Sequence, residues 1–358
     1  MTTERAAGLP PAVGGLVDAV QANCHIADAR GAADLTLCIY LLQMRELFRW
    51  EQGLAELEPV PRDAVARWLA DREGLWASME DREFGSLPLD GQQFAPFDTG
   101  AINARLRPLG LVYGAGYVGA GRASFFLGRL EGVEQRGEIE LLVCGSEHVR
   151  GLAAPVAALQ DSTVWLRRES LRRWLAEMYE AWMLKRQDGP FKSALDAHGL
   201  ARDGTEALRR MADLEGETLV LHELGEFEAG RRLGSDWQAL RDALTSRRTD
   251  LYVRAMRDHW ADCLVTLPAL LDPQRSASLH FWFANLEGVR ALLFPRLWSA
   301  YAAWGAGDRG AALRSSIAAG AAHWGVLCQH LIETHRTQGA AAPRLIDQWV
   351  LSAERALP

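Results

Sequence analysis

The spacing of apolar residues changes along the 358-residue chain, and this change limits the folds that it can adopt. Apolar and polar residues alternate in stretches such as RASFFLGRL and EIELLV, as they do in strands with one buried face. Beyond about residue 160 the apolar residues recur at helical spacing. The sequence therefore predicts a mainly α fold, an irregular multi-helix bundle with a small antiparallel β-sheet inserted in the N-terminal half.

The predicted sheet has three strands, at 110–117, 122–130 and 137–144, and a short helix is expected to follow Ser146 and reach residue 160. The helices predicted after it are 166–187, 190–199, 204–231, 235–246, 249–271, 276–303, 308–336 and 342–356. Pro295 is expected to kink its long helix. Small residues dominate 311–325, which predicts close helix packing there.

A chain of this length exceeds the roughly 250–300 residues over which one core usually grows. We therefore predict two domains, an N-terminal α+β domain at 1–160 and an all-α domain at 161–358. In the first domain we expect a helix at about 35–53. Its first half, LTLCIYLL, is apolar nearly all round, which predicts burial on several sides.

Composition excludes several classes of protein. The net charge of −7 and the lack of a basic run argue against nucleic acid as a partner. Five scattered cysteines without a CxxC pair indicate reduced thiols. No run reaches the ~18 apolar residues of a transmembrane helix, and no signal peptide is evident. The expected location is the cytoplasm, without a membrane partner.

The stretch NCHIADARGAADLTLCIYLLQMRELFRWE resembles the N-terminal signature of a family of uncharacterised bacterial proteins. The resemblance implies a bacterial origin and a two-part architecture, and it implies no activity. Within this stretch Glu46 has two interpretations. It forms an internal ion pair with Arg45 or Arg49, or it is a buried carboxylate ligand.

Two short motifs have structural explanations. GAGYVG, with Gly114, Gly116 and Gly119, follows a predicted strand but precedes another strand, so the helix that would bind a dinucleotide phosphate is missing. A glycine-rich hairpin is the better interpretation, and no nucleotide cofactor is expected. Cys144 begins CGSEH, which we interpret as a turn between a strand and a helix, because no base is positioned to activate the thiol.

The segment LEGETLVLHELGEFEAG places acids and a histidine in an apolar helical run. In one α-helix, Glu215, His222 and Glu226 fall within about 40° of each other. The HExxH zinc pattern fails because Glu226 stands where the second histidine belongs. The remaining donors suit iron, manganese or zinc. The alternative is a solvated acidic helix face that carries one histidine.

Further donors stand on later predicted helices, and a helical bundle gathers metal ligands from several facing helices. These candidate ligands are His280, Glu287, His323 and His330. The pair formed by Glu215 and His222 resembles the Glu-x6-His motif of some heme-oxygenase-like di-iron oxidases. That resemblance implies an all-helical di-iron oxidase, although His330, Glu333 and His335 do not reproduce the spacing of the later ligands in that family.

Two functions are compatible with these patterns. The first is an enzyme that depends on iron or manganese, with one or two ions, and acts as an oxidase or oxygenase on a small apolar substrate. The second is a metal-free helical scaffold that binds a small molecule or a protein. The thirteen tryptophans form core in either case, or line a ligand cavity. The sequence leaves the oligomeric state and any enzymatic activity open.

Overall fold

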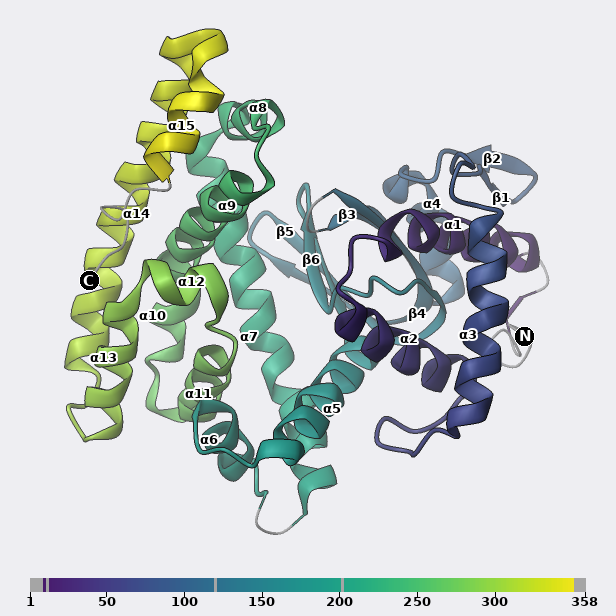
Figure 1. Cartoon of the computed structure of the whole chain (residues 1–358), viewed down its shortest axis with the longest axis horizontal. Coiled ribbons are helices and arrows are strands. Elements are labelled where there is room, and N and C mark those ends of the chain that lie inside the picture. Colours follow the sequence, from purple (N-terminus) through teal and green to yellow (C-terminus); the bar gives the residue numbers. More distant parts are fainter. Residues whose placement is uncertain (1–8, 11–12, 119–120, 201–202, 351–358) are drawn as a thin grey trace. The chain divides into compact units, whose positions relative to one another are not determined.

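The computed structural model describes residues 9–10, 13–118, 121–200 and 203–350. The chain divides into two compact units, Met1–Arg186 and Gln187–Pro358 (Figure 1). Unit 1 contains helices and the sheet, and the described part of unit 2 is helical throughout. The prediction of a mainly α fold is confirmed. Across the described residues, none of the helices combines the length and apolarity needed to cross a membrane.

The described residues of unit 1 form five α-helices and two sheets. The helices are α1 (Gly14–Ala32), α2 (Leu37–Glu51), α3 (Arg62–Ala77), α4 (Thr99–Leu106) and α5 (Arg168–Lys185). The strands are β1 (Leu87–Leu89), β2 (Gln92–Phe94), β3 (Leu111–Val118), β4 (Arg122–Arg136), β5 (Ile139–Arg150), β6 (Ala157–Gln160) and β7 (Thr163–Arg167). Strands β1 and β2 pair with each other, and the main sheet has the order β3-β4-β5-β7-β6.

The main sheet is larger than the small sheet that the sequence predicts. The three predicted strands correspond to β3, β4 and β5, but β5 continues to Arg150 and two further strands follow. The prediction of a helix after Ser146 is therefore wrong, and β5 pairs in parallel with β7. The CGS sequence, which we interpret as the end of a strand, lies instead where the register between β4 and β5 shifts at a bulge. The two strands are close there, since a Cβ at Gly128 would lie 2.6 Å from the Ser146 carbonyl oxygen.

Gly114 and Gly116 of the GAGYVG motif lie in a strand that pairs with the next strand, as the hairpin interpretation predicts. Strand β3 pairs antiparallel with β4 from Leu111 to Val118, and Gly119 lies outside the described residues. A Cβ at Gly114 would lie 2.1 Å from the Phe126 ring, so this glycine serves close packing. One face of the hairpin packs on α1 and α4, where Phe125 and Leu127 are fully buried.

The core of unit 1 also contains an ion network. Glu46 on α2 is 2% exposed, and its two oxygens accept hydrogen bonds from Arg49 and Arg173, each at 2.7 Å. Arg49 also donates to Glu180 on α5 at 3.0 Å. Of the two interpretations of Glu46, the internal ion pair is confirmed. These contacts fasten α2 to α5 within unit 1.

The first two turns of α2 do not follow the sequence prediction. Leu37 is 70% exposed and Leu42 is 51% exposed, so the expected burial of LTLCIYLL on several sides is wrong. On α2 the fully buried members of the core cluster around Trp50 and Trp76 begin at Met44, and before it Tyr40 packs against the cluster only partly buried. The apolar start of α2 therefore extends beyond the packed core.

The described residues of unit 2 form α-helices, one π-helical turn and short 3-10 turns. The helices are α6 (Pro190–Ala197), α7 (Gly204–Leu233), α8 (Ser235–Ala243), α9 (Arg247–Ala261), the π-helix (Asp262–Thr266), α10 (Leu267–Leu270), α11 (Ser276–Ala284), α12 (Gly288–Leu293), α13 (Pro295–Gly305), α14 (Ala311–Gln338) and α15 (Ala342–Val350). The predicted helix 276–303 is three helices, because Gly288 has a φ of +56° and Pro295 begins α13.

Glycines set the distance between the long helices of unit 2. A Cβ at Gly320 on α14 would lie 2.7 Å from the Cys263 sulfur, which confirms the close packing predicted for 311–325. Gly225 on α7 is tighter still, because a Cβ there would lie 2.5 Å from the carbonyl oxygen of Ala261. That contact presses α7 against the π-helical turn that follows α9.

Gly225→Ala is expected to lower the free energy of unfolding by about 1–3 kcal/mol, because the added methyl group meets backbone that cannot move aside. The control is Gly230→Ala on the same helix, where a Cβ meets nothing within 4 Å. Its expected effect is a gain of up to about 1 kcal/mol from helix propensity. Urea denaturation measures both values, and equal effects of the two changes would contradict the role assigned to Gly225.

Candidate functional site

Glu215 on α7 lies among hydrogen-bond donors of the protein. It is fully buried, and its Oε1 lies 3.1 Å from Nε2 of His198 and accepts a hydrogen bond from Ser278 at 3.2 Å. The hydroxyl of Thr218 donates to Oε2 at 2.8 Å. Glu215 thus links α7 to α11 and to the end of α6. Sequence spacing gave no sign of His198 as its partner.

His222 and Glu226 belong to a separate ion network on α7. Nδ1 of His222 lies 2.8 Å from Oδ1 of Asp262, and Arg290 on α12 binds the other oxygen of Asp262. Glu226 lies 3.5 Å from Nε2 of His222 and 2.6 Å from a terminal nitrogen of Arg257. The two predicted ligands therefore face a buried aspartate and two arginines.

The charges of this network stabilise one another. Burial alone would lower the pKa of His222, but Asp262 and Glu226 outweigh burial and hold this pKa well above the ordinary value. Burial would raise the pKa of Asp262, but His222 and Arg290 hold it at about 2. Arg257 holds the pKa of Glu226 well below its usual range, against the effect of burial. Cationic His222 thus joins a network of paired charges.

The other predicted ligands contact aromatic rings or begin a helix. Nδ1 of His280 lies 2.5 Å from the Tyr301 hydroxyl, and Glu287 precedes the first residue of α12. His323 packs edge to face on Trp324, and His330 packs on Trp349. Within the described ranges, no group of three or more His, Cys, Asp or Glu side chains is arranged to hold a metal ion.

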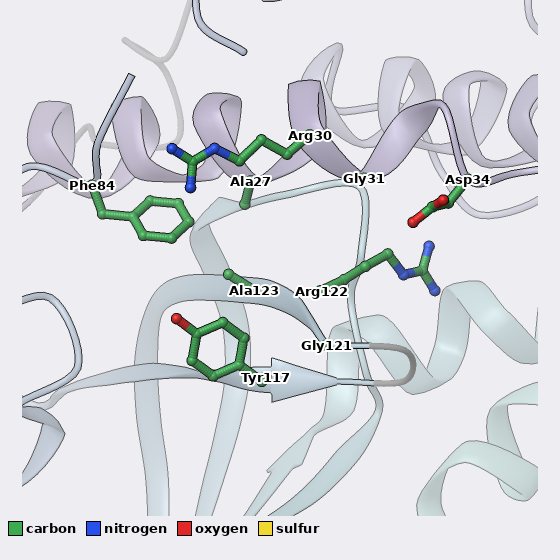
Figure 2. A pocket seen from close by; sticks show the side chains of 9 residues that line it. All are labelled: Ala27, Arg30, Gly31, Asp34, Phe84, Tyr117, Gly121, Arg122 and Ala123. Carbon is green, nitrogen blue, oxygen red and sulfur yellow. The ribbon is translucent and has the colours of Figure 1, made fainter. Parts of the chain in front are cut away.

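A pocket of about 190 Å³ lies in unit 1 between the end of α1 and the β3–β4 hairpin (Figure 2). Its floor is made of small residues of α1 and β4, among them Ala27, Gly31 and Ala123. Its functional groups are the side chains of Arg30, Asp34, Phe84, Tyr117 and Arg122. The pocket thus combines two cations, one anion and two aromatic rings.

Arg30 is held in place but keeps its charge. Its guanidinium donates to the backbone carbonyl of Glu80 at 3.1 Å and to that of Arg82. It also lies 4.9 Å from the centre of the Phe84 ring. The carboxylate that pairs with it, that of Glu83, is 3.6 Å away and 93% exposed, so it offsets the charge weakly.

Arg122 is the first residue of β4 and has capacity for a further hydrogen bond. Its Nε is buried and, among the described residues, has no hydrogen-bond partner. Its aliphatic stem passes over Gly31, where a Cβ would lie 3.2 Å from Cδ. In Figure 2 the carboxylate of Asp34 points toward the guanidinium.

Aromatic packing fixes the apolar side of the pocket. Tyr117 is 66% exposed and stacks on Phe97 with ring centres 5.0 Å apart. Phe84 contacts Phe97 and Phe125 edge to face, at 5.8 and 4.9 Å. Sequence reasoning missed this pocket, because the packing of α1 on β4 places Arg30 and Arg122 around one hollow and no motif records that packing.

Comparisons with known proteins support the division into two parts. Residues 15–167 match the N-terminal domain of a family of unknown function (DUF6866), and residues 172–353 match the C-terminal domain of the same family. The chain belongs to the DUF6866 family. No curated protein and no solved structure matches it.

The DUF6866 N-terminal domain contains the pocket with Arg30 and Arg122, and the C-terminal domain contains the network around His222. The sequence predicts a domain boundary near residue 160, whereas in the structure the first compact unit ends at Arg186. Helix α5 accounts for this difference, because Glu46 holds its Arg173 in unit 1.

His222→Gln is expected to lower the free energy of unfolding by about 3 kcal/mol at pH 6, because it leaves buried Asp262 without its imidazolium partner. The pKa of His222 is raised in the folded protein, so its contribution is complete below about pH 6.5 and is lost as the pH rises through the raised value. The difference from wild type should therefore shrink at alkaline pH in urea denaturation.

The matched control is His330→Gln, which changes an exposed histidine on α14. Its expected effect is within about 0.5 kcal/mol at every pH. A penalty for His222→Gln that stays constant from pH 6 to pH 10 would show that His222 acts by packing and not by charge.

Proposed function

We propose that this protein is a metal-free binding protein whose unit 1 pocket takes a small organic anion. The observation that supports this most is the buried Nε of Arg122, which lines the pocket and has no hydrogen-bond partner among the described residues. A guanidinium binds carboxylate or phosphate through charge-assisted hydrogen bonds. An anionic group of the ligand would pair with the guanidinium of Arg122.

The second cation strengthens the proposal. Arg30 contributes a guanidinium whose orientation is set by two neutral carbonyl groups and the Phe84 ring. Neutral acceptors fix the group without cancelling its charge. The three ionic side chains that line the pocket, Arg30, Arg122 and Asp34, carry a formal charge of +1, which exposed Glu83 outside the lining offsets only weakly and an anionic ligand would neutralise.

The size and the walls of the pocket limit the ligand. A cavity of about 150 Å³ accommodates a benzene molecule in other proteins. The pocket here is about 190 Å³ and has Phe84 and Tyr117 on its walls. It therefore suits a ligand of about one ring, with an apolar body and an anionic group that reaches Arg122.

The alternative is an iron or manganese enzyme centred on Glu215, His222 and Glu226. The contacts of these residues support the metal-free proposal, because each carboxylate already accepts hydrogen bonds or an ion pair from the protein. Metal analysis of the purified protein, together with its absorption spectrum, tests the alternative. Stoichiometric iron or manganese would favour the enzyme.

Arg122→Met is expected to weaken the binding of benzoate at least tenfold, because a charge-assisted hydrogen bond contributes about 1.5–3 kcal/mol. Calorimetric titration of the full chain after dialysis against a chelator measures this loss. Wild-type protein should bind benzoate equally well before and after dialysis, since the proposed site contains no metal.

The control variant is Arg129→Met, which removes an arginine that is 64% exposed on the same strand. Its affinity for benzoate should equal that of wild type. If neither benzoate nor inorganic phosphate binds to wild type, or if Arg122→Met binds them as wild type does, the proposed function is wrong.

A further inference from the structure

Asp34 adds a negative charge to a pocket wall that also contains two arginines. It follows α1 and lines the same pocket as Arg30 and Arg122, with its carboxylate pointing toward the guanidinium of Arg122 (Figure 2). The binding wall thus presents an anion and a cation that face each other. A ligand that reaches Arg122 must also come close to Asp34.

This arrangement disfavours a ligand that carries only negative charge. A carboxylate bound to Arg122 would lie near the carboxylate of Asp34, and like charges at short range repel each other. An ammonium group on the same ligand would remove this repulsion, because it could pair with Asp34. Since Arg122 and Asp34 face each other, the two ligand charges must also be close together.

We infer that the ligand is an α-amino acid, with its carboxylate on Arg122 and its ammonium group on Asp34. This inference rests on the proposed function and specifies its ligand class. An α-amino acid carries the two charged groups on one carbon atom, so both can reach a pair of facing side chains. A ligand whose carboxylate and ammonium groups are separated by several carbon atoms does not fit this arrangement.

The remaining walls select the side chain of the amino acid. Phe84 and Tyr117 are aromatic, and Tyr117 is backed by the ring of Phe97. The volume of about 190 Å³ accommodates an apolar side chain of about one ring. Leucine and phenylalanine are therefore the probes that fit this chemistry.

The test compares each amino acid with the same molecule without its ammonium group. Calorimetric titration of the full chain uses leucine against 4-methylpentanoate and phenylalanine against 3-phenylpropanoate. Wild type should bind at least one of the amino acids about tenfold more tightly than it binds the matching carboxylate without the ammonium group. Asp34→Asn should bind that amino acid about tenfold more weakly than wild type does. It should bind the carboxylate without the ammonium group at least as tightly as wild type does.

The control for charge is Asp71→Asn, which changes an exposed aspartate on α3 and should leave both affinities unchanged. Circular dichroism and urea denaturation confirm that each variant is folded. The inference is overturned if wild type binds the plain carboxylates more tightly than the amino acids. It is also overturned if Asp34→Asn raises the affinity for both molecules equally, since Asp34 would then only compete with the ligand carboxylate for Arg122.

The two proposals fail in different ways. If plain carboxylates bind through Arg122 but neither amino acid binds more tightly, the amino-acid inference fails and the anion-binding function stands. If neither class of molecule binds to wild type, both proposals fail.

Discussion

Buried carboxylates and their cationic partners hold each unit together. In unit 1 the carboxylate of Glu147 is fully enclosed, and Arg167 binds both its oxygens at 3.1 and 2.7 Å, which fastens β5 to β7. In unit 2 Asp262 has the same role toward His222 and Arg290. An unpaired buried charge costs several kcal/mol, so each carboxylate requires its cation. This requirement explains why a sequence rich in acids and histidines resembles a metal protein while its side chains pair with one another.

The pocket in unit 1 departs from this pattern. The interior pairs match cation with buried anion, whereas Arg30 is held mainly by backbone carbonyls and its carboxylate partner, Glu83, is exposed. The unpartnered Nε of Arg122 is a feature that Arg257 and Arg290 of the interior network share, so it is the position of Arg122 in the pocket wall that distinguishes it. Both guanidinium groups are fixed by packing, Arg30 on Phe84 and the stem of Arg122 over Gly31. A rigid donor needs little reordering to bind an anion, which favours binding. The excess of cations at this one place is the physical basis of the proposed function.

Much of the fold follows from local periodicity, and much of the site does not. Most helices of unit 2 and the pairing of β3 with β4 are predicted, because apolar spacing records which face of an element is buried, but the predicted helix 276–303 divides at Gly288 and Pro295. Strand β7 was missed because a charged residue, Arg167, ends it within the core, which no sequence pattern reveals. Helical geometry places Glu215 and His222 on one helix, but their partners, His198 and Asp262, come from other segments. The partners of a buried charge depend on tertiary packing, so spacing along a single helix could not distinguish ion pairs from metal ligands.

The measurement that tests this account most directly is the nuclear magnetic resonance signal of the arginine Nε–H groups during titration with benzoate. The signal of Arg122, assigned by its absence in Arg122→Met, is expected to shift in proportion to bound benzoate as the guanidinium gains an anionic partner. The signal of Arg129, which lies on the same strand and pairs with Glu131, is expected to stay in place. Saturable movement of the Arg122 signal alone agrees with an anion site at this pocket. An unchanged Arg122 signal at saturating benzoate would contradict it.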